Sequence, residues 1–180
     1  VDFNVPLDAE RNITDDSRMQ AHLPTVKTII EKGGRPVVMS HLGRPKDGPD
    51  ASLSLYHLVA HLESVSGYPV EFASDCVGDD VVAATKDLGE NTILLLENLR
   101  FHKGETKGDE DFAAALAQNG DVYINDAFGT AHRAHASTAI IAKHFSGKKA
   151  FGHVLKAEID NVNKVLQGGE QPGTAIVGGA

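Results

Sequence analysis

The stretch TILLLENLRFH, residues 92–102, holds a short, continuously apolar run followed by basic side chains. The run from Ile93 to Leu96 has no polar residue, which is typical of a strand covered on both faces. Strands of this kind occur in parallel sheets that carry helices on either side. Arg100 and His102 follow the end of this strand, and open α/β sheets bind ligands at the carboxyl ends of their strands.

Strand patterns and helix patterns alternate along the rest of the chain. The predicted strands cover residues 1–5, 36–41, 70–73, 92–98, 122–126 and 174–177. The predicted helices cover residues 16–32, 54–66, 79–88, 109–118, 137–145 and 156–166. Pro24 interrupts the first helical pattern and predicts a kink or a fresh start there. The alternation predicts an α/β fold in which helices sandwich a parallel sheet.

Composition bounds the class of protein. A chain of 180 residues with 41% hydrophobic and 23% charged residues predicts a single globular domain over residues 1–180. The single cysteine, Cys76, excludes an internal disulfide framework. No apolar run approaches the length of a membrane span and no signal peptide is visible, so we expect a cytoplasmic protein without a membrane partner. A net charge of -8 opposes nonspecific binding of nucleic acid.

The two ends of the sequence fall in predicted strands. The chain starts with VDFNVP, without a Met, and stops at AIVGGA, directly after an apolar run. Termini ordinarily lie in exposed polar segments. We therefore expect a domain cut from a longer protein.

Arginines gather after the predicted strands. VVMSHLGRP supplies Arg44, TILLLENLRFH supplies Arg100 and DVYINDAFGTAHRAH supplies Arg133, while Arg18 stands near the start of the first helix. Four of the six arginines are thus expected at one rim, whereas most of the eleven lysines are scattered. The guanidinium fork matches carboxylate and phosphate oxygens in pairs. Each arginine alone would pass as a surface residue, but together they predict a small polyanionic ligand.

Histidine spacing does not predict a metal site. His57 and His61 have the spacing of a helical zinc site, but Leu58 stands where a metalloprotease carries its glutamate. Arginine flanks His132 and His135 and repels a cation, so we expect these two to bond an anion or the backbone. His22, His144 and His153 are interpreted as surface or core residues.

Nucleotide motifs are missing from the sequence. No G-x-G-x-x-G follows a strand, and SGKK at residues 146–149 lacks the upstream glycine of a phosphate loop. No pattern demands a covalent nucleophile. The chain itself is expected to hold neither a nucleotide cofactor nor a metal.

Five motifs resemble the phosphoglycerate kinase family in order and spacing. They are VDFNVP, SHLGRP, LLLENLRFH, DVYINDAFGTAHRAH and GGA, and the resemblance spans essentially all 180 residues. It covers the amino-terminal half of that family, which binds 3-phosphoglycerate or 1,3-bisphosphoglycerate. It implies a three-layer α/β/α sandwich with a Rossmann-like six-stranded parallel sheet of order 3-4-2-1-5-6.

The resemblance also implies roles for individual residues. A basic patch for the remote phosphate corresponds to His41, Arg44, Arg100 and Arg133. Arg18 corresponds to the catalytic arginine that reaches toward the transferred phosphoryl group.

The remaining candidate residues lie beside that patch. Asp2 and Asn4 share one face of the first predicted strand, and the resemblance makes them partners of the substrate's hydroxyl region. His132 neighbours the basic patch, and the resemblance implies gating or orientation for it.

The activity that the resemblance implies is reversible phosphoryl transfer between 1,3-bisphosphoglycerate and ADP in glycolysis and gluconeogenesis. Mg-ATP and Mg-ADP would bind a carboxyl-terminal domain that is absent from these residues, so this chain is expected to be inactive alone. The full-length enzyme is expected to be a monomer that closes about a hinge near residues 152–155.

Two other classes compete with the kinase interpretation. A non-catalytic phosphate-binding α/β domain would show the same rim arginines without needing all five motifs. A Rossmann-type oxidoreductase would need the glycine fingerprint that is absent. The codons that follow Ala180 would discriminate between a kinase and a binding module.

Overall fold

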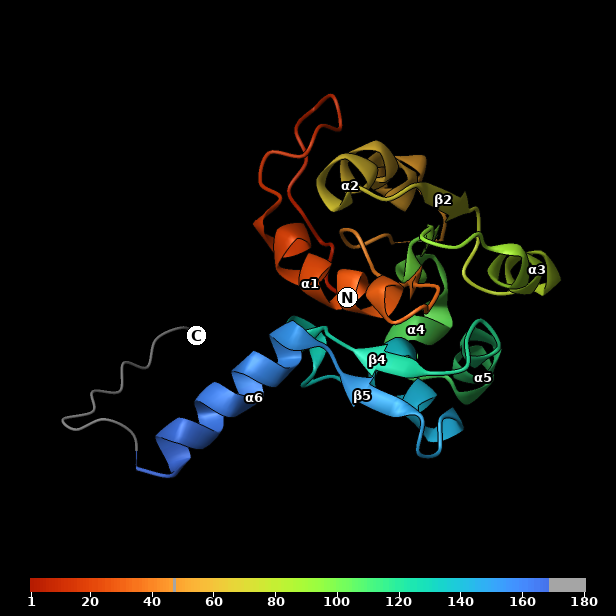
Figure 1. Ribbon diagram of the computed structural model, residues 1–180. Coiled ribbons are helices and arrows are strands. Elements are labelled where there is room, and N and C mark those ends of the chain that lie inside the picture. Colours follow the sequence, from red (N-terminus) through yellow and green to blue (C-terminus); the bar gives the residue numbers. More distant parts are fainter. Residues whose placement is uncertain (47, 169–180) are drawn as a thin grey trace.

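The computed structural model describes residues 1–46 and 48–168, and it shows a mixed α/β body from which the last helix extends (Figure 1). The helices of these residues are α1 (Ser17–Glu31), α2 (Val59–Ser66), α3 (Asp79–Asp87), α4 (Lys103–Lys107), α5 (Glu110–Ala117) and α6 (His153–Leu166). The strands are β1 (Val37–Val38), β2 (Val70–Ala73), β3 (Ile93–Leu96), β4 (Tyr123–Asn125) and β5 (Lys149–Phe151). Every pairing between these strands is parallel, which confirms an α/β protein with parallel strands.

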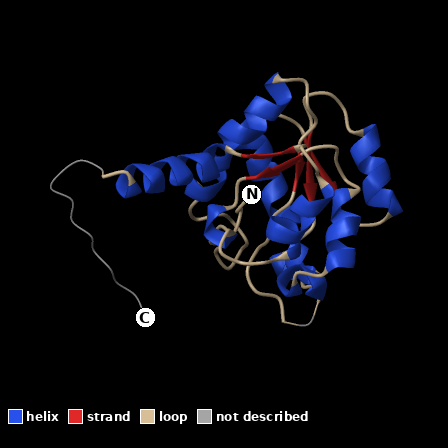
Figure 2. Ribbon diagram, turned by 90° about the horizontal axis from the view of Figure 1, so that it is seen from below, coloured by secondary structure: helices blue, strands red, loops and turns tan. Residues whose placement is uncertain are grey.

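β3 is the central strand of a three-stranded sheet with the order β1-β3-β2. Val37 lies opposite Leu94, and Val70 lies opposite Ile93. All four residues of β3 are buried, as the apolar run predicted, and the strands lie among the helices (Figure 2). The neighbours agree with the predicted succession of the third, fourth and second strands.

A second sheet contains a strand that the sequence analysis missed. β5 pairs with β4, with Ala150 opposite Ile124. All three residues of β5 are exposed, so it shows neither an apolar run nor an alternating pattern. It takes the place beside the fifth predicted strand that the sequence analysis gave to residues 174–177, which lie outside the described residues.

Residues 1–5 do not form the predicted strand. The amino group of Val1 donates to the carbonyl of Met39, but the N–H of Phe3 donates to the hydroxyl of Ser40. A side-chain acceptor at that position replaces the backbone carbonyl that a regular ladder requires. The segment nevertheless lies alongside the end of β1.

Two helical predictions need correction. α1 runs unbroken from Ser17 to Glu31 with Pro24 inside it, so of the two predicted alternatives, a kink or a fresh start, the fresh start is wrong. The helix expected at 137–145 is a π-helical turn, η5 (Ala136–Ile140), followed by a 3₁₀ turn, η6 (Ile141–His144). The carbonyl of His135 accepts the N–H of both Ala139 and Ile140, which widens the first turn.

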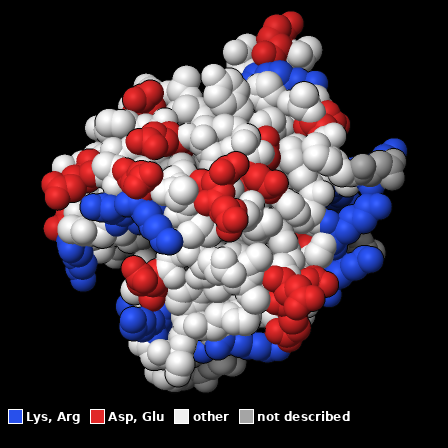
Figure 3. Space-filling model, turned by 90° about the vertical axis from the view of Figure 1, so that its right-hand side faces the viewer, with Lys and Arg blue, Asp and Glu red and all other residues white. Residues whose placement is uncertain are grey.

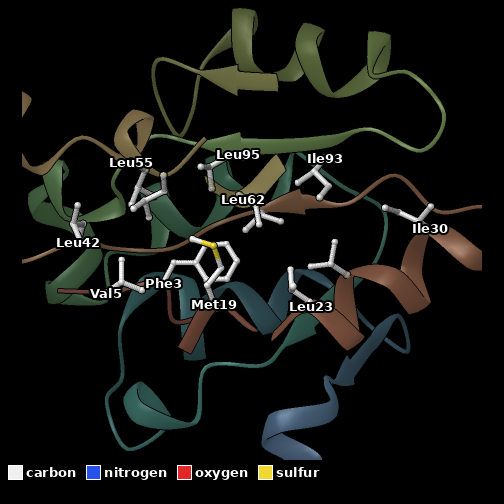
Figure 4. Close-up of a cluster of buried hydrophobic side chains, with 13 residues drawn as sticks. Phe3, Val5, Met19, Leu23, Ile30, Leu42, Leu55, Leu62, Ile93 and Leu95 are labelled. Atoms are coloured by element: carbon white, nitrogen blue, oxygen red, sulfur yellow. The ribbon is translucent and has the colours of Figure 1, made fainter. Parts of the chain in front are cut away.

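The largest buried cluster holds the amino-terminal segment in place. Phe3 and Met19 are fully buried, and they pack with Leu23, Ile93 and Leu95 between α1 and the first sheet (Figure 4). Burying a side chain of this size contributes roughly 1.5–3 kcal/mol. Because Phe3 and Val5 point into this cluster, the alternate residues Asp2 and Asn4 are directed away from it.

The surface that carries α3 and α5 shows acidic and basic side chains interspersed (Figure 3). Interspersed charge of this kind is ordinary solvated surface and does not mark a polyanion site. Among the described residues, no helix combines the length and the apolar character that a bilayer span would need.

Candidate anion-binding site

The seven residues that were predicted to bind the substrate all line one pocket of about 450 Å³. They are Asp2, Asn4, Arg18, His41, Arg44, Arg100 and Arg133. They come from the amino-terminal segment, from α1, and from the loops that follow β1, β3 and β4. The structure therefore brings together residues separated by up to 131 positions in the sequence, although their roles in binding stay predictions.

His132 is the one candidate that does not line this pocket. Its side chain is exposed, and its Nε2 accepts a hydrogen bond from Nε of Arg133 at 3.2 Å. His132 thus contacts the basic patch from outside, and gating or orientation stays a prediction.

Asn4 and Arg100 hold the loop after β1 from two sides. The Oδ1 atom of Asn4 accepts the N–H of Gly43 at 2.9 Å, and Nη1 of Arg100 donates to the Gly43 carbonyl at 2.8 Å. Gly43 has a φ of 61°, a conformation that favours glycine, and a Cβ there would lie 2.7 Å from Leu53. These bonds fix the direction in which His41 and Arg44 enter the pocket.

Arg18 is paired within the pocket. Its Nη1 lies 2.9 Å from Oδ2 of Asp2, while 55% of its side chain is exposed. An ion pair this exposed is worth less than about 1 kcal/mol. Asp2 Oδ1 also accepts the N–H of Asn4, which keeps the carboxylate oriented. The guanidinium can therefore leave Asp2 for another anion at small cost.

The pocket has positive charge in excess. Burial lowers the pKa of Arg100, and the nearby positive charges of Arg133 and Arg44 lower it further, against the opposing effect of Glu105 and Asp2. His41 has its pKa lowered from 6.5 to about 4 by burial and by Arg100. Repulsion among Arg44, Arg100 and Arg133 is relieved when an anion enters the pocket.

A cavity that shares His41 and Thr130 with the pocket is lined by a buried pair, Glu105 and His135, that the sequence did not predict. Glu105 accepts hydrogen bonds from both the N–H and the hydroxyl of Ser137, and its Oε1 lies 3.7 Å from Nδ1 of His135. Burial raises the pKa of Glu105, although the bonds from Ser137 and the charge of Arg100 oppose the rise. These residues line a second cavity of about 30 Å³, which is enough for a water molecule.

The described residues contain one grouping with metal-binding donors, and it lies outside the pocket. It consists of Asp75, Cys76 and His102. His102 Nε2 lies 2.7 Å from Asp75, and the thiol of Cys76 donates to the carbonyl of Glu97. Because each donor already has a protein partner, we assign no metal to it. In the pair His57 and His61, each side chain also has its own protein partner, the carbonyl of Ala51 for His57 and Asp16 for His61.

Acid is expected to destabilise the protein through His41. The folded pKa of about 4 lies below the ordinary value of 6.5, so between these values the unfolded chain takes up a proton that the folded chain refuses. The folding stability that is present above pH 6.5, the pKa of His41 in the unfolded chain, is therefore lost as the pH falls toward about 4, its pKa in the folded chain. In His41→Gln, urea titrations across this window should show a smaller loss of unfolding free energy than in the wild type. Equal losses would contradict a neutral, half-buried His41.

The fold and the pocket define an α/β protein with a pocket lined by four arginines at the ends of its parallel strands. The family model described as "PGK: Phosphoglycerate kinase" matches residues 1–180, and the chain therefore belongs to the phosphoglycerate kinase family.

Relatives and solved structures agree with this assignment. Phosphoglycerate kinase of Chlorobium limicola is 48% identical over 180 residues, which is 100% of this chain and 45% of that protein. The protein of the same name from Anaeromyxobacter sp. (strain Fw109-5) is 49% identical over 182 residues, with 46% of it covered. The chain spans less than half the length of these relatives.

The solved structures show the same fold. Phosphoglycerate kinase from Coxiella burnetii has a TM-score of 0.80 and 32% identity, covering 95% of this chain and 41% of that one. The enzyme from Pyrococcus horikoshii OT3 has a TM-score of 0.83 and 27% identity, covering 96% and 43%.

Proposed function

We propose that the pocket binds 3-phosphoglycerate or 1,3-bisphosphoglycerate in the phosphoglycerate kinase reaction. The observation that carries this proposal is the convergence of four arginines and a neutral histidine on one pocket of about 450 Å³. His41, Arg44, Arg100 and Arg133 take the phosphate remote from the reacting group. Asp2 and Asn4 face the glycerate hydroxyl, and Arg18 reaches the phosphoryl group that is transferred.

The reaction transfers the acyl phosphate of 1,3-bisphosphoglycerate to ADP. The bond from phosphorus to the acyl oxygen breaks, a bond to a β-phosphate oxygen of ADP forms, and 3-phosphoglycerate leaves as its carboxylate. Such transfer needs positioning and neutralisation of charge more than covalent help from the protein. This requirement agrees with a pocket lined by four arginines.

The rest of the proposal concerns the full-length protein. The nucleotide, as Mg-ATP or Mg-ADP, binds the part of the enzyme that lies beyond these residues, and the 180 residues hold no cofactor. The complete protein is a cytoplasmic monomer. In the complete protein, residues 1–5 become a regular strand and join the two sheets into a six-stranded layer between helices with the order 3-4-2-1-5-6. β5 then takes the sixth place.

Replacing Arg100 by alanine is expected to weaken 3-phosphoglycerate binding by about tenfold to a hundredfold, since a charge-assisted hydrogen bond is worth about 1.5–3 kcal/mol. Arg100→Lys should recover only part of this loss because lysine lacks the fork. Arg35→Ala is the matched control, because Arg35 donates to the carbonyl of Lys86 and does not line the pocket. Titration calorimetry measures all three, and unchanged affinity in Arg100→Ala would remove this residue from the site.

A further inference from the structure

His22 joins the pocket to the start of α6, and only 4% of its side chain is exposed. Its Nε2 accepts the backbone N–H of Asp2 at 3.2 Å, and its Nδ1 lies 3.1 Å from Oδ2 of Asp126. An imidazole with its single proton on Nδ1 satisfies both partners at once. His22 therefore links the backbone of a pocket residue to a buried carboxylate behind the pocket.

Asp126 carries this link to α6. Its Oδ2 also accepts the hydroxyl of Thr25 at 2.7 Å, and its Oδ1 accepts the N–H of Leu155 at 3.1 Å. Burial by itself would raise the pKa of this carboxyl, but the bonds from His22, Thr25 and Leu155 hold the pKa below its ordinary value. The group is thus an ionised acceptor at the first turn of a helix, where negative charge is favourable.

The first turn of α6 depends on this distant carboxylate. The helix begins after Gly152, which has no side chain to cap it, and the N–H of His153 is bonded to the hydroxyl of Thr25 at 2.9 Å. A Cβ on Gly152 would lie 2.3 Å from Cγ of Asp126. The backbone at this point is therefore in direct contact with Asp126, and any displacement of the carboxylate displaces the turn.

We propose that His22 is a positioning residue that transmits occupancy of the pocket to the first turn of α6 through Asp126. The inference rests on the proposed function, since the occupant is 3-phosphoglycerate. Asp2 lines the pocket and pairs with Arg18. A ligand that bonds Asp2 or takes Arg18 from it shifts the Asp2 backbone, and the N–H of Asp2 is the first link of the chain.

α6 also forms part of the pocket wall. Val154 and Glu158 of α6 line the same pocket as Asp2 and Arg18. The orientation of the first turn therefore sets where these two side chains stand relative to the ligand. By thermodynamic linkage, if the ligand changes the orientation of the first turn of α6, that orientation in turn changes the affinity for the ligand.

The relay is tested by following two backbone amides while 3-phosphoglycerate is added to the ¹⁵N-labelled full-length protein. Gly43, bonded to Asn4 in the pocket, reports binding, and Leu155, bonded to Asp126, reports the first turn of α6. In the wild type both amide signals should shift along the same binding curve. A shift at Gly43 without one at Leu155 overturns the relay and leaves the proposed function standing.

Two substitutions separate the relay from simple packing. His22→Leu fills the space but neither accepts from Asp2 nor donates to Asp126, so the Leu155 shift should fall at least about fivefold while the Gly43 shift remains. His22→Gln carries one acceptor and one donor and should restore the shift. His61→Leu removes another histidine–aspartate contact, of 2.8 Å to Asp16, outside the pocket and should change nothing.

Each outcome decides the proposal. A full Leu155 shift in His22→Leu overturns the relay, as does a loss that His22→Gln fails to restore. If His22→Leu does not fold, Asp126→Asn interrupts the relay at its second residue. A Leu155 shift in Asp126→Asn as large as in the wild type would overturn the relay. Silence of both amides in the wild type, at saturating ligand, overturns the proposed function and the relay with it.

Discussion

In the full-length enzyme, replacing Arg18 by alanine is expected to lower turnover by about a hundredfold to a thousandfold, with little change in the affinity for 3-phosphoglycerate. The reason lies in the geometry of the pocket. Arg18 is 55% exposed and, within the described residues, forms an ion pair with Asp2 alone, whereas Arg100 is fixed on Gly43. A guanidinium that is free to move can follow charge that develops during transfer, and such an interaction raises the rate more than it raises the affinity.

Steady-state kinetics with 3-phosphoglycerate varied at saturating Mg-ATP would test this role. Arg18→Lys should retain part of the rate, because it keeps the charge but loses the fork. Arg35→Ala again serves as the control, as an exposed arginine away from the pocket. A raised Michaelis constant with unchanged turnover in Arg18→Ala would assign Arg18 to ground-state binding instead.

The site residues that directly follow strands could be predicted, because the strand pattern and the residue after it stand together in the sequence. The apolar run of β3 and the basic residues directly after it stand together in the sequence, so Arg100 was placed at the rim by the rule for parallel sheets. The same rule placed Arg44 and Arg133. All three line the pocket in the structure. The rule gives the edge of the sheet at which a residue lies, but not the direction of its side chain, and this is why His132 was grouped with Arg133 although it lies outside.

The parts of the site supplied by helices could not be predicted in the same way. His22 was interpreted as a surface or core residue, and it is both buried and part of the pocket wall. Its position one helical turn after Arg18 was the signal available, because residues four apart share a helix face. Glu158 gave no signal, since its place in the pocket depends on how α6 is held by Asp126, more than thirty positions away in the chain.

β5 shows the same limitation in the fold. Its three residues are exposed, and its strand conformation comes from pairing with β4 rather than from its own pattern. Propensity and periodicity describe a residue's own environment, while an exposed strand is defined by its neighbour's backbone. The apolar run at 174–177 therefore received the sixth place in the prediction, because it carried the pattern that β5 lacks.

The 180 residues by themselves are expected to bind 3-phosphoglycerate and to show no phosphoryl transfer. The basic patch lies entirely within this chain, and the contacts that orient it, from Asn4 to Gly43 and from Arg100 to Gly43, are internal to it. The sequence contains neither a dinucleotide fingerprint nor a phosphate loop, and the chain covers 45% of the relative from Chlorobium limicola. Binding and transfer should therefore separate.

A coupled assay with Mg-ATP and 3-phosphoglycerate should read background for these 180 residues, while an amide titration shifts signals around Gly43. Arg100→Ala should abolish most of the titration response without changing the assay, which separates weak binding from absent chemistry. Turnover that scales with protein concentration across independent preparations would refute this division of labour. An absent titration response at millimolar ligand would instead show that the basic patch needs the rest of the enzyme to hold its geometry. The four arginines of the pocket repel one another until a partner or a ligand neutralises their charge.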